Sequence, residues 1–517
     1  MKNCFTRAAL MMLVAFAFAA QDAQASYEFY DGRLVLNGFV KETMYVRPSL
    51  TGREKPYRDT HIDYANTSAL LETLYTVTDN EDYTLRLYGG VKAWWEKTSI
   101  YDDEQRRNIP HRFRKEYQYP RHFDDDILTE AYINIIKGPL ELRVGKQIVI
   151  WGQLDMDRVA DVVNPLDLRK GVPGIDTWEE IKRGVWMIRG LYQSELPGNL
   201  LFEFIFNPGD FRNMLLPDEG TRYGEMKANS LVSTSGVPDF GIVHWQFEKM
   251  RRDAPGFNFK HYEFGFKILG YFWNTDWSLI YFNSLSDTPV ANPNRVMPFT
   301  MDYIASAIRG RPAPDWTDQK IYHYKRFQTI GGTAQTYLHW LSRTVWRAEW
   351  AYQIGVPMNK GTEGAASATY DWTRRDAFAV AVACSKSVNI PWFTRSWIAT
   401  NRQFDWTLTY SYTKIFNHDH DLVLGGGGQG YNHSANDKIS LFLKQDLFHM
   451  VFIVTFNGYY TFHTGKWMAV PTLTYLFPGV HWKMDVGYAA FGGSKTRHVS
   501  HTMSEKDSFI LRLRYEF

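Results

Sequence analysis

The chain has 517 residues, of which 44% are hydrophobic and 16% aromatic. Its mean hydropathy of -0.37 is too polar for a bundle of transmembrane helices, and no stretch after residue 25 offers the roughly 20 apolar residues that a spanning helix needs. The 31 Tyr, 34 Phe and 18 Trp are typical of membrane β-barrels, which carry aromatic girdles at both bilayer interfaces. Composition therefore leaves a soluble secreted protein or a membrane β-barrel with a polar lumen.

Residues 1–25 have the pattern of a secretion signal, with a positive start, an apolar run at 8–20 and a small-x-small site at 23–25. We expect its removal, because the apolar run is too short for the alternative of a retained anchor. Residues 26–517 would then form the mature domain. Loss of Lys2, Arg7 and Asp22 from totals of 58 basic and 56 acidic residues leaves a net charge of +1. This balance excludes general nucleic-acid binding, which needs a strongly basic domain.

Segments of about ten residues with alternating apolar and polar side chains recur along the mature chain, as transmembrane β-strands require. In chain order, we predict strands at 34–46, 61–78, 82–97, 127–137, 140–151, 183–194, 199–207, 261–271, 274–284, 321–338, 343–355, 376–388, 403–414, 435–447, 449–463, 466–477, 480–491 and 507–517. Short turns at 79–82, 137–139, 195–198, 274–276 and 477–479 alternate with long connections at 98–126, 152–182, 208–260, 285–320, 357–375, 415–434 and 492–506. The fold class is thus all-β, a transmembrane antiparallel up-and-down β-barrel of about 18 strands.

An even strand number places both termini on the periplasmic side, as a bacterial barrel requires. For this reason the strand-like segment 241–247 is assigned to the 208–260 connection. Only residues 26–33 precede the first strand, so we expect no N-terminal plug. Long connections can fold into such a barrel, and residues 301–308 are amphipathic at helical spacing. They are a candidate constriction helix, or equally a short surface helix.

The last strand shows the alternation best, because residues 509, 511, 513, 515 and 517 are apolar or aromatic and Arg512, Arg514 and Glu516 lie between them. A charged face in a dry core would cost several kcal/mol for each unpaired ion, on the order of 2–7 even for a neutral polar group, whereas a water-filled lumen removes that cost. A terminal Phe517 on such a strand resembles the signal that the barrel assembly machinery reads. We therefore predict that this machinery is a partner.

The same alternation assigns a set of charged side chains to the lumen, and we take these as the candidate selectivity residues. They are Arg86, Lys92, Glu96, Glu141, Arg143, Arg189, Arg347, Glu349, Lys444, Lys483, Asp485, Arg512 and Arg514. Basic groups outnumber acidic ones in this set by nine to four, which predicts a weak preference for anions. The alternative is that these charges pair across strands and only solvate the wall.

Three loop features are candidates for ligand contacts. The basic centre of 98–126 would suit lipopolysaccharide phosphates or steer anions, although a self-paired, solvated loop is the favoured interpretation. Asp124–Asp126 would offer carboxylates to Ca²⁺, and His418, His420 and His433 would offer imidazoles to a transition metal. Neither set has the spacing of a known site, so we predict no metal and no cofactor. Cys384 alone remains after the signal, which excludes an intrachain disulfide and a c-type haem site.

Several short motifs carry a family resemblance. They are LRVGKQIVIWG at 142–152, VNPLD at 163–167, VPG at 172–174, EFG at 263–265, NTDWS at 274–278, SDTP at 286–289 and IPWF at 390–393. The run resembles a proteobacterial outer-membrane porin-like β-barrel family labelled a domain of unknown function, and is more remotely similar to alginate-export and substrate-selective porins. The resemblance implies a channel that accompanies an RND-type inner-membrane transporter and a periplasmic lipoprotein. Residues 153–160, with Asp155 and Asp157, match no part of the family pattern.

These observations predict a channel in the outer membrane, reached by export through the periplasm, that passes solutes through its lumen. Two alternatives stay open: a partner-dependent conduit for lipid-like cargo, and a sleeve for an electron-transfer cytochrome. An enzyme is not expected, because neither G-x-S-x-G nor H-E-x-x-H occurs and no Ser is placed beside His481 and Asp485 by sequence alone. Lipid and lipopolysaccharide are the expected surroundings.

Overall fold

The computed structural model describes residues 26–47, 61–96, 119–120, 122–169, 171, 174–215, 256–309, 322–341, 343–362, 368–390, 398, 403–423, 433–493 and 507–517. The predicted signal at 1–25, the basic centre of the 98–126 connection and the strand-like segment 241–247 lie outside these residues. Among the described helices, none has both the length and the apolar character needed to cross a membrane.

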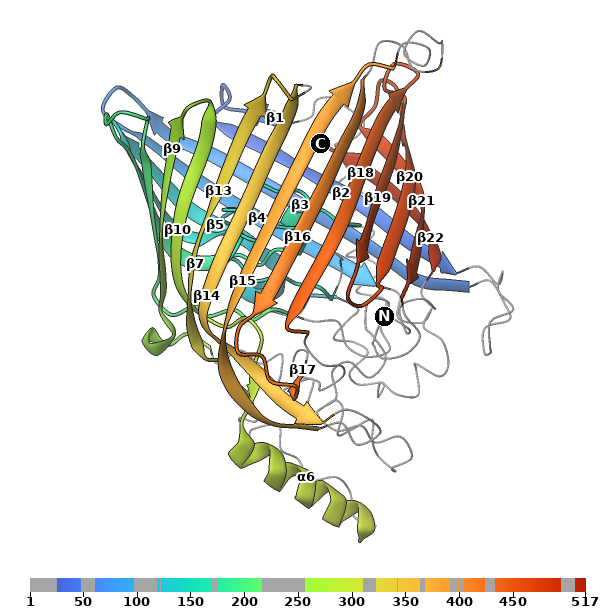
Figure 1. Ribbon diagram of the computed structural model, residues 1–517. Coiled ribbons are helices and arrows are strands. Elements are labelled where there is room, and N and C mark those ends of the chain that lie inside the picture. Colours follow the sequence, from blue (N-terminus) through green and yellow to red (C-terminus); the bar gives the residue numbers. More distant parts are fainter. Residues whose placement is uncertain are drawn as a thin grey trace, which may run out of the picture.

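Eighteen antiparallel strands form a closed barrel, as predicted (Figure 1). They are β2 (Leu34–Arg47), β3 (His61–Asp79), β4 (Thr84–Glu96), β5 (Leu128–Lys137), β6 (Leu140–Gln147), β7 (Val185–Gln193), β8 (Leu201–Asn207), β9 (Glu263–Phe272), β10 (Thr275–Leu285), β13 (Arg326–Leu338), β14 (Thr344–Thr362), β15 (Ala368–Val388), β16 (Phe404–Ile415), β18 (Ala435–Leu447), β19 (Phe452–Thr461), β20 (Trp467–Leu476), β21 (Trp482–Gly492) and β22 (Ser508–Glu516). Each pairs with its neighbour in sequence, and β22 pairs back onto β2 to close the sheet.

Short elements decorate this barrel. Strand β1 (Tyr27–Phe29) pairs with β2, and β17 (Leu422–Val423) pairs with β14. Strands β11 (Val290–Ala291) and β12 (Tyr322–His323) form a separate ladder. The described helices are η2 (Phe123–Ile127), α4 (Trp178–Ile181), η3 (Phe259–His261) and α6 (Pro293–Ile308). From Ser26 onward, only β1 and a turn precede β2, so the described chain places no plug domain before the barrel.

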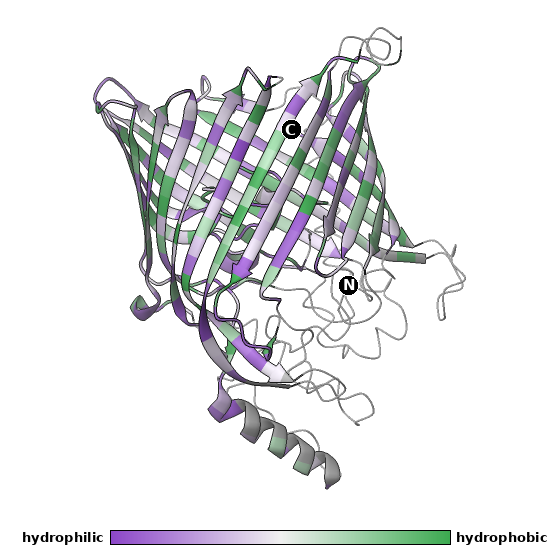
Figure 2. Cartoon of the chain, viewed as in Figure 1, coloured by the Kyte–Doolittle hydropathy of each residue, from purple (hydrophilic) through white to green (hydrophobic). Residues whose placement is uncertain are grey.

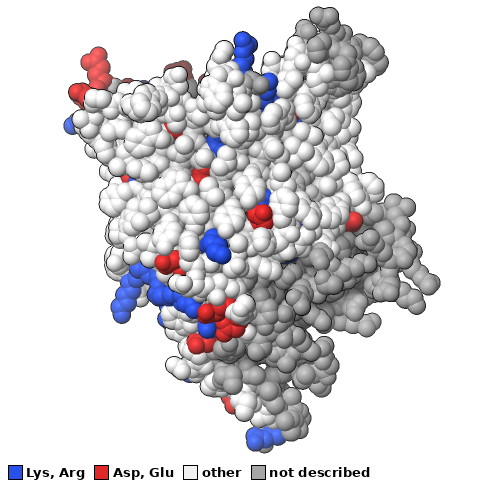
Figure 3. Space-filling model, viewed as in Figure 1, with Lys and Arg blue, Asp and Glu red and all other residues white. Residues whose placement is uncertain are grey.

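The strands alternate between an apolar outer face and a mixed inner face, as a membrane barrel requires (Figure 2). Exposed apolar side chains cover the outer wall, among them Leu87, Ile133, Val144, Ile188, Phe204, Leu279, Leu408, Val454, Val486, Leu511 and Leu513. Exposed aromatic side chains gather beside the short turns, including Tyr83, Tyr192, Trp273, Tyr337 and Trp340. Figure 3 shows a broad band of the wall with few charged groups and a charged cluster nearer the long-loop rim.

Strand length varies around the barrel. Strands β14 and β15 have 19 and 21 residues and extend as a hairpin beyond the wall, whereas β6 and β8 have only 8 and 7 (Figure 1). A transmembrane strand needs roughly 9–11 residues, so the wall is at its lowest over β5–β8. Helix α6 projects away from the barrel (Figure 1). The prediction of a constriction helix at 301–308 is therefore wrong, and its alternative, a surface helix, holds.

Candidate functional site

A segment between β6 and β7 folds into the lumen, and we call residues 148–184 the infolded segment (Figure 1). Strand β6 ends at Gln147, so the predicted continuation of the strand to 151 is wrong. Asn164 explains the turn inward, because its side chain joins both ends of the segment. Its Oδ1 accepts from Val149 N (2.7 Å), and its Nδ2 donates to Gln147 O (3.0 Å) and to Arg183 O (2.8 Å).

Three apolar contacts seat the infolded segment on the inner wall. Trp151 is 1% exposed and packs edge-on to Phe282 of β10, at a ring-centroid distance of 5.8 Å. Its Nε1 donates to Glu203 of β8 (3.1 Å). Leu154 packs on two alanines of β15, and Ile175 packs on an inner cluster from β2, β3 and β20–β22. Burial of one large apolar side chain contributes about 1.5–3 kcal/mol, so these contacts hold the segment at widely separated points.

Glu349 of β14 fixes the first bend of the infolded segment. The side chain is fully buried, and its carboxylate accepts three backbone N–H bonds, from Gln153, from Leu154 (2.7 Å) and from Ala160 (2.8 Å). Hydrogen bonds to a charged group contribute about 1.5–3 kcal/mol each. This residue belongs to the predicted lumen set, and the structure places it as an anchor of the bend at 153–160.

Acidic side chains of the infolded segment pair with basic side chains of the wall. Asp155 lies 3.3 Å from Arg347 of β14, and Asp157 pairs with Lys438 of β18 and accepts from Ser440 (3.2 Å). Further around the wall, Asp176 lies 2.8 Å from Arg512 of β22.

Helix α4 carries the last of these acids. Glu180 pairs with Lys41 of β2 and lies 3.0 Å from Arg514. Lys92 donates to the Glu180 carbonyl (3.0 Å). Burial alone would raise the pKa of the Glu180 carboxyl, but Lys41, Lys92 and Arg514 outweigh it and lower the pKa to about 2. The carboxylate is therefore charged throughout the neutral and mildly acidic range.

The predicted selectivity residues separate into two groups. Lys92, Arg347, Glu349, Arg512 and Arg514 contact the infolded segment. The others lie on the wall and most of them form ion pairs there: Arg143 with Glu141, Arg189 with Glu203, Lys444 with Asp446, Lys483 with Glu516, and Asp485 with Arg512 at 3.7 Å. Glu96 is buried, and Arg86 is half-buried opposite Thr76. Arg189, Lys483 and Asp485 pair across neighbouring strands, as in the alternative raised above, whereas Arg143 and Lys444 pair within their own strands.

A cavity of about 750 Å³ remains between the infolded segment and the wall. It reaches from Phe517 and Gly38 near the short-turn rim to Lys146 and Gly184, at the long-connection ends of β6 and β7. Its lining includes eight basic and eight acidic side chains. The acids of the infolded segment therefore offset the excess of basic groups that the wall strands alone suggested.

Sequence reasoning missed several of these side chains. Lys41 and Lys438 share the inner faces of correctly predicted strands, so strict alternation would have found them. Asp157, Asp176 and Glu180 lie in a predicted outside loop, and no local signal shows that it folds inward. The departure from the family pattern at 153–160 was the nearest indication.

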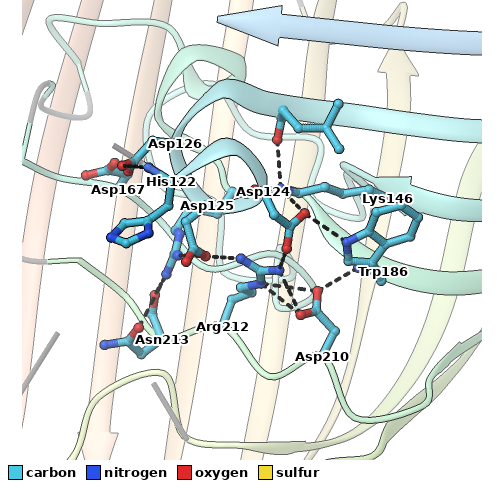
Figure 4. Close-up of polar contacts among 12 residues, drawn as sticks. His122, Asp124, Asp125, Asp126, Lys146, Asp167, Trp186, Asp210, Arg212 and Asn213 are labelled. Carbon is cyan, nitrogen blue, oxygen red and sulfur yellow. Dashed lines mark hydrogen bonds and ion pairs between the residues drawn. The ribbon is translucent and has the colours of Figure 1, made fainter. Parts of the chain in front are cut away.

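The loop carboxylates are engaged by cations. Asp124 and Asp125 pair with Arg212 (Figure 4). Asp126 lies 3.3 Å from Arg169. Asp419 pairs with Arg375 and Lys360 in the same way. Within the described ranges, no group of three or more His, Cys, Asp or Glu side chains is arranged to hold a metal ion.

The fold and the lumen define a transmembrane β-barrel of the outer-membrane type, with a constriction built from one long connection. The chain belongs to the family described as protein of unknown function (DUF1302), whose model matches residues 50–438.

Three solved structures show the extent of the fold similarity. OccAB2 of Acinetobacter baumannii is 9% identical, covering 94% of this chain and 98% of that chain with a TM-score of 0.47. OccK2 (OpdF) of Pseudomonas aeruginosa is 10% identical, with 95% and 99% covered and a TM-score of 0.46. A BenF-like porin from Pseudomonas fluorescens Pf-5 is 8% identical, with 94% and 98% covered and a TM-score of 0.45. Among curated proteins, none matches this chain.

Proposed function

We propose that this protein is an outer-membrane channel that passes solutes through its lumen, with the infolded segment setting the width and charge of the passage. The observation that carries the proposal is the contact of one segment with β2, β14, β18 and β22. These contacts leave a cavity of about 750 Å³ between the segment and the part of the wall that includes β2–β5 and β22. A constriction that leaves a polar cavity suits selective passage, because the lining charges contact a solute at close range.

Weak anion preference remains our expectation for the ion selectivity. The wall supplies a cationic excess, but Asp155, Asp157, Asp176 and Glu180 each pair with a basic wall residue. The expected shift of reversal potential in a salt gradient is therefore small. A clear cation preference would contradict this part of the proposal.

Single-channel recording of the purified protein in a planar bilayer tests the proposal. We expect steady openings in the folded, heat-modifiable barrel. The matched comparison is Glu349→Ala, which releases the bend of the infolded segment, against Glu141→Ala, which removes a lumen carboxylate that pairs with Arg143 on the same strand. A folded barrel without conductance in all three proteins would contradict a diffusive channel.

One observation favours the second candidate, a partner-dependent conduit for lipid-like cargo. An apolar cluster of the inner wall, with Tyr45, Met468, Phe491 and Ile510, meets Ile175 of the infolded segment. The cluster is buried beneath Ile175, so it would accept a hydrocarbon group only where the infolded segment moves off the wall. A barrel that conducts no ions alone, but transfers a lipid in the presence of an inner-membrane transporter and a periplasmic lipoprotein, would support this candidate.

The cytochrome sleeve has no such support, because the infolded segment occupies the lumen that a cytochrome would have to fill. Phe517 stays our predicted assembly signal. Its backbone exchanges hydrogen bonds with Gly38 (2.7 and 3.0 Å) where β22 meets β2, so the recognised residue would lie at the strand pair that closes the barrel.

A further inference from the structure

The hydrogen-bond ladder between β5 and β6 ends before β5 does. Its last rung joins Ala131 to Lys146. Leu128 and Glu130 continue β5 and are paired with β4, but within the described chain they have no β6 partner. Instead, Ile148 N donates to the side-chain Oε1 of Glu130 (2.8 Å). We call this end of the ladder the β5–β6 seam. Gly184 packs against the Thr129 carbonyl here, and bonds that involve side chains replace the backbone ladder.

Lys146 bridges the seam. Its ladder partners are Ala131 and Trp186, and Trp186 is exposed on the outer wall. The Lys146 side chain is only 2% exposed and lines the lumen cavity, so it lies within the wall. Its Nζ donates to Leu128 O (2.7 Å) and to the carbonyl of Asp124 (Figure 4). Asp124 in turn accepts from Trp186 Nε1 (3.0 Å) and pairs with Arg212.

Two hollows lie near this lysine, one on each side of the wall, and no residue lines both. On the inside, the lumen cavity reaches Thr129, Lys146, Ile148 and Gly184. On the outside, a groove of about 540 Å³ runs over β4–β7, bordered by Ala131 and Gly145 of the last rungs. Its side walls are Leu87, Ile133, Val144, Trp186 and Ile188, all exposed on the membrane face. Lys146 and its partners lie between the groove and the cavity.

Gly145 shapes the wall at this point. Its φ of 141° lies in the region that glycine favours, and a Cβ there would approach Ala131 O to 2.1 Å. The backbones of β5 and β6 therefore approach each other closely one residue before the ladder opens. The last paired residues of β5 and β6 therefore lie directly beside the β5–β6 seam.

We propose that the β5–β6 seam is a lateral entrance through which an amphipathic molecule, with one hydrocarbon chain and a polar head, passes between the membrane and the lumen cavity. The apolar groove suits the chain, and the cavity, with its equal numbers of acidic and basic groups, suits the head. The entrance rests on the proposed channel function, since it names a class of cargo and the side from which that cargo arrives.

Site-directed labelling of a lumen cysteine from the bilayer tests the entrance. Cys384 is first replaced by Ser, because its rung partner Trp346 places it on the outer face. Thr177→Cys then supplies a reporter, since Thr177 lines the lumen cavity and its side chain is exposed there. A maleimide with a hexadecyl chain, dissolved in the bilayer of a nanodisc, delivers the probe laterally. A water-soluble sulfonated maleimide reports access from the aqueous mouths.

Two pairs of matched variants decide the result. Val144→Trp fills the groove, whereas Val486→Trp places the same bulk on the exposed outer face of β21. We expect Val144→Trp to slow labelling by the bilayer probe roughly tenfold, as an overpacked passage should, and to leave the water-soluble probe unaffected. Lys146→Met removes the hydrogen bond to Leu128 O. Because one hydrogen bond from a charged group is lost, labelling by the bilayer probe should become roughly tenfold faster. Lys444→Met, at a lysine remote from the seam, should not.

The outcomes separate the two proposals. The entrance would be overturned if the bilayer probe labelled Val144→Trp and Val486→Trp at equal rates, or Lys146→Met and Lys444→Met at equal rates. The channel proposal would be unaffected by that result if conductance persists. The labelling differences without conductance would uphold the entrance and overturn the diffusive channel. Failure of both probes to label the reporter would overturn both, because the cavity would then be closed to the membrane and to water.

Discussion

Glu349→Ala is the sharpest test of the infolded segment as the constriction. The wild-type carboxylate accepts three backbone N–H groups at the bend over 153–160, while the side chain is fully buried. Each bond to a charged acceptor contributes about 1.5–3 kcal/mol, but bonds that share an acceptor are not additive. We therefore assign a loss of about 3 kcal/mol to removal of the whole set.

That loss shifts the ratio of docked to undocked segment by a factor on the order of 100, since about 1.4 kcal/mol corresponds to tenfold. In single-channel recordings, the variant should spend far more time in a high-conductance state than the wild type. Glu349→Gln should fall between them, because its amide nitrogen cannot accept the Ala160 N–H while its oxygen still accepts at the other side.

Glu141→Ala is the matched control, because Glu141 pairs with Arg143 on the same strand and does not take part in the bend. Heat-modifiable electrophoretic mobility shows that each variant still forms a barrel. Identical gating of Glu349→Ala, Glu141→Ala and the wild type, in folded protein, would refute the assignment of the segment as the constriction.

The remaining predictions concern charge, pH and packing. The double variant Asp176→Asn/Glu180→Gln should increase anion selectivity, since it frees Arg512, Arg514 and Lys41 from their partners; an unchanged reversal potential would contradict this. The stabilisation that Glu180 gives to the docked segment is present above its ordinary pKa of 4.5 and is lost as the pH falls through about 2, so the open probability should stay constant from pH 7 to 5 and rise only in stronger acid. Glu180→Gln should remove the part of that acid response that comes from this carboxyl. Opening near pH 6 would count against the assigned ion pairs. Trp151→Ala should cost about 3–5 kcal/mol of segment packing, seen as a lower midpoint of heat modification, whereas the exposed Trp340→Ala should leave the midpoint unchanged.

Local sequence determined most of the barrel. Alternation with a period of two is imposed residue by residue, because one face of every strand meets lipid and the other meets water or polar groups. The 18 strands, the short turns and the lumen side of residues such as Arg347 and Arg512 follow from that rule. The long hairpin β14–β15 exceeds its prediction, since backbone pairing continues beyond the membrane, where alternation is no longer required.

Tertiary structure alone decided which connection enters the lumen. Residues 152–182 are predicted from the sequence as an outside loop, and the ion-pair partners of Asp157, Asp176 and Glu180 lie more than 130 residues away in the chain. Helix α6 carries a clearer local helical signal but projects away from the barrel (Figure 1). An infolded segment is held by the sum of distant ion pairs, buried carboxylate bonds and apolar contacts, and those terms exist only once the barrel has closed around it.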